Sequence, residues 1–115
     1  MKRVHTYKVE IFMGSRSGYT EKIFSYEKVH DICQNYCNDV KLGLTLTKTE
    51  YIYVSGNEPG YIIGLINYPR FPDGEVNINE KAFTLAKLLL VNLEQERCTV
   101  MTPFETFLLE KEDID

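Results

Sequence analysis

Gly60-Tyr61-Ile62-Ile63-Gly64-Leu65-Ile66-Asn67-Tyr68 is the stretch that decides the fold of this 115-residue chain. Its residues are apolar at both alternating positions, whereas a strand with one buried face is apolar only at every second position. A strand that is apolar on both sides belongs in the middle of a sheet, where both of its faces are covered. We therefore expect residues 60–68 to form a central strand.

The residues before this stretch predict a partner strand. Residues 43–55 are rich in Thr, Leu, Tyr, Ile and Val, and residues 56–60 have the Gly, Asn and Pro content of a hairpin turn. Lys48 and Glu50 interrupt the apolar alternation, which predicts either a bulge or an extension of the hairpin beyond the body of the sheet. We expect residues 43–55 to pair antiparallel with the central strand.

Two helices are predicted by apolar residues at three- and four-residue spacing. The first covers residues 26–40 and follows Ser25, whose hydroxyl can cap it. The second covers residues 78–96, where Asn77 and Glu80 have the spacing of a capping box.

Two strands remain, one at each end of the chain. Residues 5–13 alternate between apolar and polar side chains, and residues 98–102 are rich in β-forming residues. Pro103 permits only an edge strand or a bend at that point. Phe104 to Leu109 form a possible extra strand.

The order of these elements, βαββαβ, predicts an α+β fold of the ferredoxin-like class. In this fold a four-stranded antiparallel sheet carries two helices on one face, and the first and third strands are central. A chain of 115 residues and 13.4 kDa has the size of one domain, so we expect residues 1–115 to form a single domain.

The second face of this sheet predicts an oligomer. Two helices cover only one face, yet residues 60–68 are apolar on both sides and Phe12 adds to the far side. A second copy, residues 104–109 or a ligand must cover it. The fold resembles that of the PII and CutA families, whose subunits share this topology, bind small ligands between subunits and assemble as trimers, although the chain has none of their motifs. We predict a homo-oligomer, either a dimer or a trimer.

The charge and composition exclude several partners. Lys and Arg number 13 against 17 Asp and Glu, and no basic run could follow a phosphate backbone, so nucleic acid is not expected. The basic start lacks the apolar segment of a signal peptide, and the aliphatic run at residues 88–91 is too short for a membrane span. We therefore expect no membrane contact and a cytoplasmic protein. Cys33, Cys37 and Cys98 lack metal-site spacing and are expected in the core.

The loop after the first strand is the first candidate site, because its backbone N–H groups, hydroxyls and guanidinium could converge on a small anion. Its candidate ligand-binding residues are Gly14, Ser15, Arg16, Ser17, Gly18 and Thr20. Gly14-x-Arg16-x-Gly18 resembles the phosphate-binding loop of the acylphosphatases, which share the ferredoxin-like fold, and this resemblance implies hydrolysis of acyl phosphates. The chain lacks the second Arg of that family's pattern and has no matched position for its catalytic Asn.

The end of the central strand is the second candidate site. Asn67 and Arg70 are the candidate ligand-binding residues, and they lie among aromatic residues that suit a ligand rim or an interface. Alternatively, Tyr68 and Phe71 close the core there. Glu58 could also be a functional carboxylate, although a solvated hairpin turn explains it equally well.

These observations predict a binding function but no catalysed reaction. No Ser/His/Asp set, P-loop or metal-spaced cluster occurs in the sequence, so we name no catalytic residue, metal or cofactor and favour a protein that is not an enzyme. The best interpretation is a non-catalytic homo-oligomer that binds a small anionic or nucleotide-like ligand. The alternatives are a protein–protein interaction module and an acylphosphatase-like phosphate hydrolase.

Overall fold

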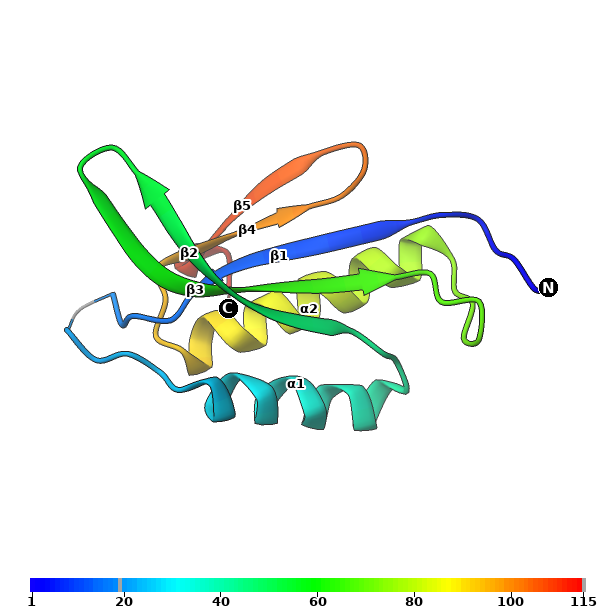
Figure 1. The fold of residues 1–115 in the computed structure, drawn as a ribbon, viewed down its shortest axis with the longest axis horizontal. Coiled ribbons are helices and arrows are strands. Elements are labelled where there is room, and N and C mark those ends of the chain that lie inside the picture. Colours follow the sequence, from blue (N-terminus) through cyan, green and yellow to red (C-terminus); the bar gives the residue numbers. More distant parts are fainter. Residues whose placement is uncertain (19, 115) are drawn as a thin grey trace.

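The computed structural model describes residues 1–18 and 20–114, which form a five-stranded antiparallel sheet with two helices on one of its faces (Figure 1). The strands lie in the order β2-β3-β1-β4-β5. This arrangement confirms the ferredoxin-like prediction, including the extra C-terminal strand. In chain order the elements are β1 (Lys8–Gly14), α1 (Tyr26–Val40), β2 (Thr45–Tyr53), β3 (Gly56–Ile66), α2 (Glu75–Asn92), β4 (Arg97–Met101), β5 (Thr106–Glu110) and a 3₁₀ turn (Lys111–Asp113).

Strand β3 is central, as its apolar pattern predicts. It pairs with β1 from Gly60 to Ile66 and with β2 on its other side. Its odd-numbered residues Tyr61, Ile63 and Leu65 are buried towards the helices. Because successive strand residues point to opposite faces, the even-numbered residues face away from the helices. This second face, which we call the open face, is not covered by residues 104–109, because residues 106–109 extend the edge of the sheet as part of β5 and residues 104 and 105 lie in the loop that precedes it.

The β2–β3 turn differs from the prediction. The turn lies at Val54 and Ser55, where Ser55 has a φ of 63°, and the residues predicted to turn belong to β3. Pro59 is tolerated in this strand because β1 ends opposite Gly60, so no N–H donor is needed on that side. The β2–β3 register is unbroken from Thr45 to Tyr53, so the hairpin extends beyond β1 without a bulge.

Helix α2 begins at Glu75, three residues before its predicted start at residue 78. Gly74 is the N-cap residue, and the Asp73 carboxylate accepts hydrogen bonds from the Gly74 N–H (2.8 Å) and the Asn77 side chain (3.0 Å). Asn77 therefore lies inside the helix instead of capping it. The helix ends at Asn92 rather than residue 96, and Glu94 follows with a φ of 51°. Helix α1 has the predicted bounds, and the Ser25 hydroxyl accepts from the Lys28 N–H.

The core lies between the helices and the inner face of the sheet. All three cysteines are free thiols, and Cys33 and Cys98 are buried in this core. Burial raises the pKa of each of these two thiols to about 12. The prediction of core cysteines is confirmed for Cys33 and Cys98, whereas Cys37 is only half-buried. None of the helices in residues 1–18 and 20–114 is long and apolar enough to cross a membrane.

Shortening buried side chains of α2 should measure how much this core contributes to the free energy of unfolding. Leu85 and Leu89 are fully buried, so Leu85→Ala or Leu89→Ala should each reduce the free energy of unfolding by about 2–5 kcal/mol. Leu88 on the same helix is 39% exposed, and Leu88→Ala should cost much less. Urea unfolding followed by circular dichroism gives the three values. Equal losses at positions 88 and 89 would contradict the observed orientation of the helix.

Candidate functional site

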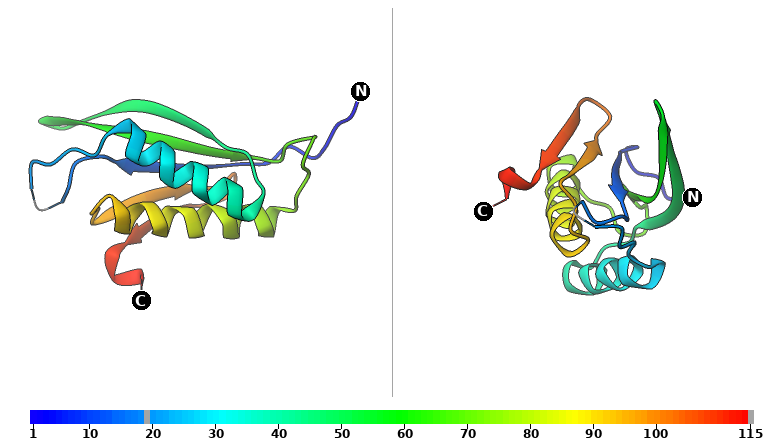
Figure 2. Two further views of the ribbon diagram at one scale, coloured as in Figure 1. Left: turned by 90° about the horizontal axis from the view of Figure 1, so that it is seen from below. Right: turned by 90° about the vertical axis from the view of Figure 1, so that its left-hand side faces the viewer.

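A pocket of about 210 Å³ lies on the open face of the sheet. The β2–β3 and β4–β5 hairpins stand on either side of β1, as the right-hand view of Figure 2 shows, and both contribute to the lining of the pocket. The lining residues combine two charges, an amide, a phenol and apolar side chains. They are Phe12, Gly14, Tyr51, Glu58, Gln95, Arg97, Cys98, Thr99 and Leu108.

Tyr51 forms one wall and is held firmly by the backbone. Its hydroxyl donates to the carbonyl oxygens of Tyr61 (2.8 Å) and Met13 (3.2 Å). The ring reaches those carbonyls across Gly60, where a Cβ would collide with it. Burial raises the pKa of Tyr51 to about 12, and the nearby Glu58 carboxylate adds to this shift. Tyr51 is therefore a neutral, fixed aromatic side chain near neutral pH.

The pocket contains one acidic and one basic side chain that are available to a ligand. Glu58 is half-buried and lies directly opposite Tyr51 in the β2–β3 pairing, and Arg97 is exposed at the start of β4. Within residues 1–18 and 20–114 neither makes an ion pair or hydrogen bond. Phe12 and Leu108 supply apolar surface in the same pocket. A zwitterionic ligand with an apolar middle suits this arrangement.

Gln95 places a fixed acceptor at the bottom of the pocket. Its side chain is buried, and its Nε2 donates to the carbonyl oxygens of Arg16 (2.7 Å) and Leu93 (2.8 Å). Its Oε1 faces Gly14, since a Cβ on Gly14 would lie only 2.6 Å from that oxygen. Gln95 Oε1 therefore packs closely against Gly14, and a side chain at this position would displace the amide.

Of the predicted loop residues, Gly14 lines this pocket and the others bind mainly to the chain itself. The Ser15 hydroxyl donates to the Pro59 carbonyl (3.1 Å), and the Ser17 hydroxyl lies 3.3 Å from the Glu94 carboxylate. The backbone N–H groups of Ser17 and Gly18 donate to the carbonyls of Lys22 and Glu94. Thr20 Oγ1 accepts from the Lys22 N–H, and Arg16 Nε is buried without a hydrogen-bond partner among the described residues.

Asn67 and Arg70 lie at the opposite end of β1 from that loop. Gly14 pairs with Gly60, whereas Lys8, at the other end of β1, pairs with Ile66. This separation is about 20 Å for six residues of antiparallel strand. The predicted residues therefore fall into two groups at opposite ends of the sheet. Asn67 connects segments there: its Nδ2 donates to the His5 carbonyl, and its Oδ1 accepts from the Asp73 N–H.

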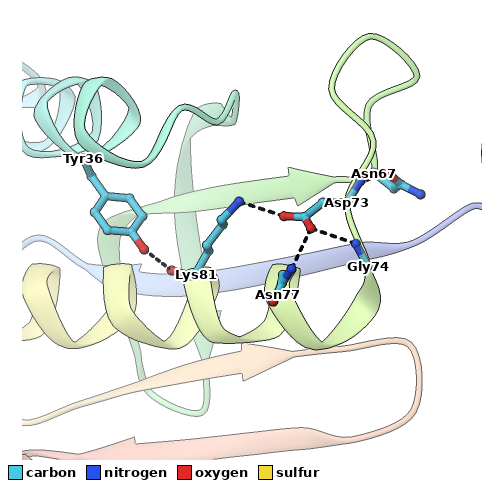
Figure 3. Close-up of polar contacts among 6 residues, drawn as sticks. All are labelled: Tyr36, Asn67, Asp73, Gly74, Asn77 and Lys81. Carbon is cyan, nitrogen blue, oxygen red and sulfur yellow. Dashed lines mark hydrogen bonds and ion pairs between the residues drawn. The ribbon is translucent and has the colours of Figure 1, made fainter.

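A smaller pocket of about 130 Å³ lies beside Asp73 and Lys81. The Lys81 ammonium is 2.7 Å from Asp73 Oδ2, and Tyr36 donates to the Lys81 carbonyl (Figure 3). Hydrogen bonds from Lys81 and Asn77 lower the pKa of Asp73. The stability that this carboxylate contributes is present above its usual pKa of about 3.9 and is lost as the pH falls through the lowered value. Both carboxylate oxygens of Asp73 already accept hydrogen bonds from the chain itself, so this cluster stabilises the start of α2.

The pocket on the open face was missed in the sequence because its residues come from five separate segments. Tyr51 and Glu58 had a usable signal: each lies the same distance from the Val54–Ser55 turn, which makes them cross-strand neighbours. That signal was hidden because Gly56 to Gly60 resemble a turn more than a strand. Gln95 and Arg97 carry no local motif.

No protein-family model matches the chain, and no curated protein matches its sequence. Two solved structures match its fold, and both are of a phage SAM lyase. The structure in complex with S-methyl-5'-thioadenosine is 17% identical with a TM-score of 0.73, and the match covers 100% of this chain and 98% of the other. The apo structure is 16% identical with a TM-score of 0.71 and coverages of 97% and 96%. At this level of identity the likeness shows the shared fold.

This finding contradicts the functional prediction from the sequence. The fold that the chain shares over its full length is that of an enzyme, so the prediction of a non-catalytic ligand-binding protein and the preference for a protein that is not an enzyme are both corrected. Neither solved structure is of an interaction module or an acylphosphatase. The sequence prediction failed because it looked for local motifs, and the pocket on the open face has none.

Proposed function

We propose that this chain is a SAM-cleaving enzyme that releases S-methyl-5'-thioadenosine from the pocket on the open face. The observation that carries the proposal is the match to a SAM lyase over nearly the whole of both chains. The matched structure holds S-methyl-5'-thioadenosine, which contains the sulfur, methyl group and adenosyl group of SAM. A reaction that forms this product breaks the bond between the sulfur and the γ-carbon of the methionine part.

The electrons of such a cleavage balance within the substrate. The electron pair of the broken bond between sulfur and the γ-carbon stays on the sulfur, which changes from a sulfonium to a neutral thioether. A lyase adds no water, so the γ-carbon accepts a pair from the substrate's own carboxylate oxygen and a five-membered lactone forms. Ring closure by a group in the same molecule gains from proximity and requires no proton transfer.

The lining of the pocket supports this chemistry. Glu58 and the Tyr51 ring provide a negative charge and an aromatic side chain for the sulfonium, which has no N–H to donate and is attracted by charge alone. Arg97 provides a cation for the carboxylate. The step joins opposite charges within the substrate, so the apolar surface of Phe12 and Leu108 favours the less polar transition state.

The size of the pocket supports an oligomer, which the sequence analysis also predicts. A volume of about 210 Å³ is below the roughly 300–1,000 Å³ usual for sites that enclose a ligand of this class. Ile66 on the same face is 38% exposed. A second copy packed on the open face would cover both this residue and the rest of the ligand. We therefore retain the prediction of a dimer or trimer.

Incubation of the purified protein with SAM tests the proposal. We expect S-methyl-5'-thioadenosine to form in proportion to enzyme, as measured by liquid chromatography and mass spectrometry, with the lactone identified by proton NMR. S-Adenosylhomocysteine as the product would indicate methyl transfer instead. The absence of any SAM-derived product above a heat-denatured control would refute the proposed function.

A further inference from the structure

The structure assigns to Gln95 the role of a fixed hydrogen-bond acceptor for the α-ammonium group of the substrate, in the part of the pocket that Gly14 also lines. This inference rests on the proposed function and identifies a binding residue of the same site. It concerns a side chain that lies outside the strands, in the segment between α2 and β4.

The orientation of the Gln95 amide follows from its hydrogen bonds. Both hydrogens of its NH₂ group are used, because Nε2 donates to the carbonyls of Arg16 and Leu93. A flipped amide would place Oε1 against those two carbonyl oxygens, which is unfavourable. Oε1 therefore faces Gly14, and the side chain is 8% exposed, so it has little freedom to move away.

The surroundings of this oxygen favour a cation. Gln95 Oε1 and Glu58 Oε2 both lie beside Gly14, at 2.6 Å and 3.7 Å from the position that a Cβ on this residue would take, so a neutral acceptor and a carboxylate border the same part of the pocket. A ligand N–H can use both the hydrogen bond and the charge. A neutral hydroxyl or aromatic amine could make the hydrogen bond but would gain nothing from the negative charge of Glu58.

Among the positive groups of SAM, the ammonium fits this space better than the sulfonium. The ammonium has three N–H donors, whereas the sulfonium has none and gains nothing from a neutral carbonyl oxygen. Arg97, the cation assigned to the α-carboxylate, lines the same pocket. The α-ammonium and α-carboxylate are attached to one carbon, so their partners must lie close together, as Gln95 and Arg97 do.

Two variants test the inference through binding rather than turnover. Gln95→Met removes the acceptor and keeps the length of the side chain. Gly14→Ala keeps the Gln95 amide but displaces its Oε1, because the new Cβ would lie only 2.6 Å from that oxygen. Gly14 does not have a positive φ, so the backbone itself accepts alanine. Gly74→Ala is the matched control, because a Cβ there meets no atom within 4 Å. Thermal unfolding of all variants verifies that they are folded.

Isothermal titration compares two ligands that differ in the amino-acid part. Sinefungin is a SAM analogue that keeps the α-ammonium and cannot be cleaved, whereas S-methyl-5'-thioadenosine lacks the amino-acid part. We expect Gln95→Met and Gly14→Ala to weaken sinefungin binding about tenfold or more, and the binding of S-methyl-5'-thioadenosine by less than about threefold. Gly74→Ala should change neither.

The outcomes separate this inference from the proposed function. Equal weakening of both ligands would mean that Gln95 only shapes the pocket, and unchanged sinefungin binding would mean that it contacts no ammonium. Either result overturns the assignment while the parent still forms S-methyl-5'-thioadenosine. A parent that neither binds nor cleaves SAM refutes the proposed function, and the assignment with it.

Discussion

Glu58→Gln should reduce kcat/KM for SAM by about 10- to 100-fold, mostly through an increase in KM. The carboxylate is the negative group that faces the sulfonium in the proposed site, and two opposite unit charges about 4 Å apart attract by about 1 kcal/mol in water and about 4 kcal/mol near a protein surface. Glutamine keeps the shape and removes the charge. Initial rates of S-methyl-5'-thioadenosine formation over a range of SAM concentrations give both constants.

Glu50→Gln is the matched control for this variant. Glu50 lies in β2 next to Tyr51, so its side chain points to the opposite face of the hairpin from the pocket. We expect near-parent kinetics for it. A loss of activity in Glu50→Gln that equals the loss in Glu58→Gln would place the reaction elsewhere and refute the assignment of the pocket.

Leu65→Glu should abolish folding of the subunit, whereas Ile66→Glu should give a folded protein with fewer subunits than the parent. Leu65 is 3% exposed in the core between sheet and helices, and an unpaired charge there costs several kcal/mol out of a total stability of about 5–15 kcal/mol. Ile66 is 38% exposed on the open face, where a charge affects only what is packed against it.

Soluble yield and circular dichroism report on the first variant, and light scattering reports on the second. A parent that remains a monomer at high micromolar concentration would refute the predicted oligomer. Soluble, fully folded Leu65→Glu would contradict the observed register of β3, because a shift of one residue exchanges the two faces.

The strands and helices could be predicted from the sequence because their patterns are local. The double-sided apolar run of residues 60–68 identified the central strand, although the strand itself covers residues 56–66, and the stripe over residues 26–40 gave helix α1 with its observed bounds. Errors arose where two local signals competed. Gly56 and Gly60 favoured a turn, yet Ser55 with a positive φ makes it, and Gly74 is the N-cap residue of α2 in place of Asn77.

The pocket could not be predicted in this way because it is a product of strand pairing. Gly14 and Glu58 lie 44 positions apart in the sequence, and the register of β1 with β3 brings them together, while the register of β3 with β2 adds Tyr51. Arg97 joins them through a third pairing, of β1 with β4. Of the predicted ligand-binding residues, Gly14 lines this pocket, although it was chosen as part of an anion-binding loop, and Glu58, considered as a functional carboxylate, lines it as well.

The free thiols have a practical consequence for fluorescence experiments on this protein. Burial raises the pKa of Cys33, Cys37 and Cys98, so little thiolate is present near neutral pH and maleimide dyes should react with them slowly. A cysteine introduced at an exposed position, such as Leu108→Cys at the rim of the pocket, should therefore be labelled selectively without removing the native ones. A dye at this position would report ligand arrival and subunit exchange by a change in its emission.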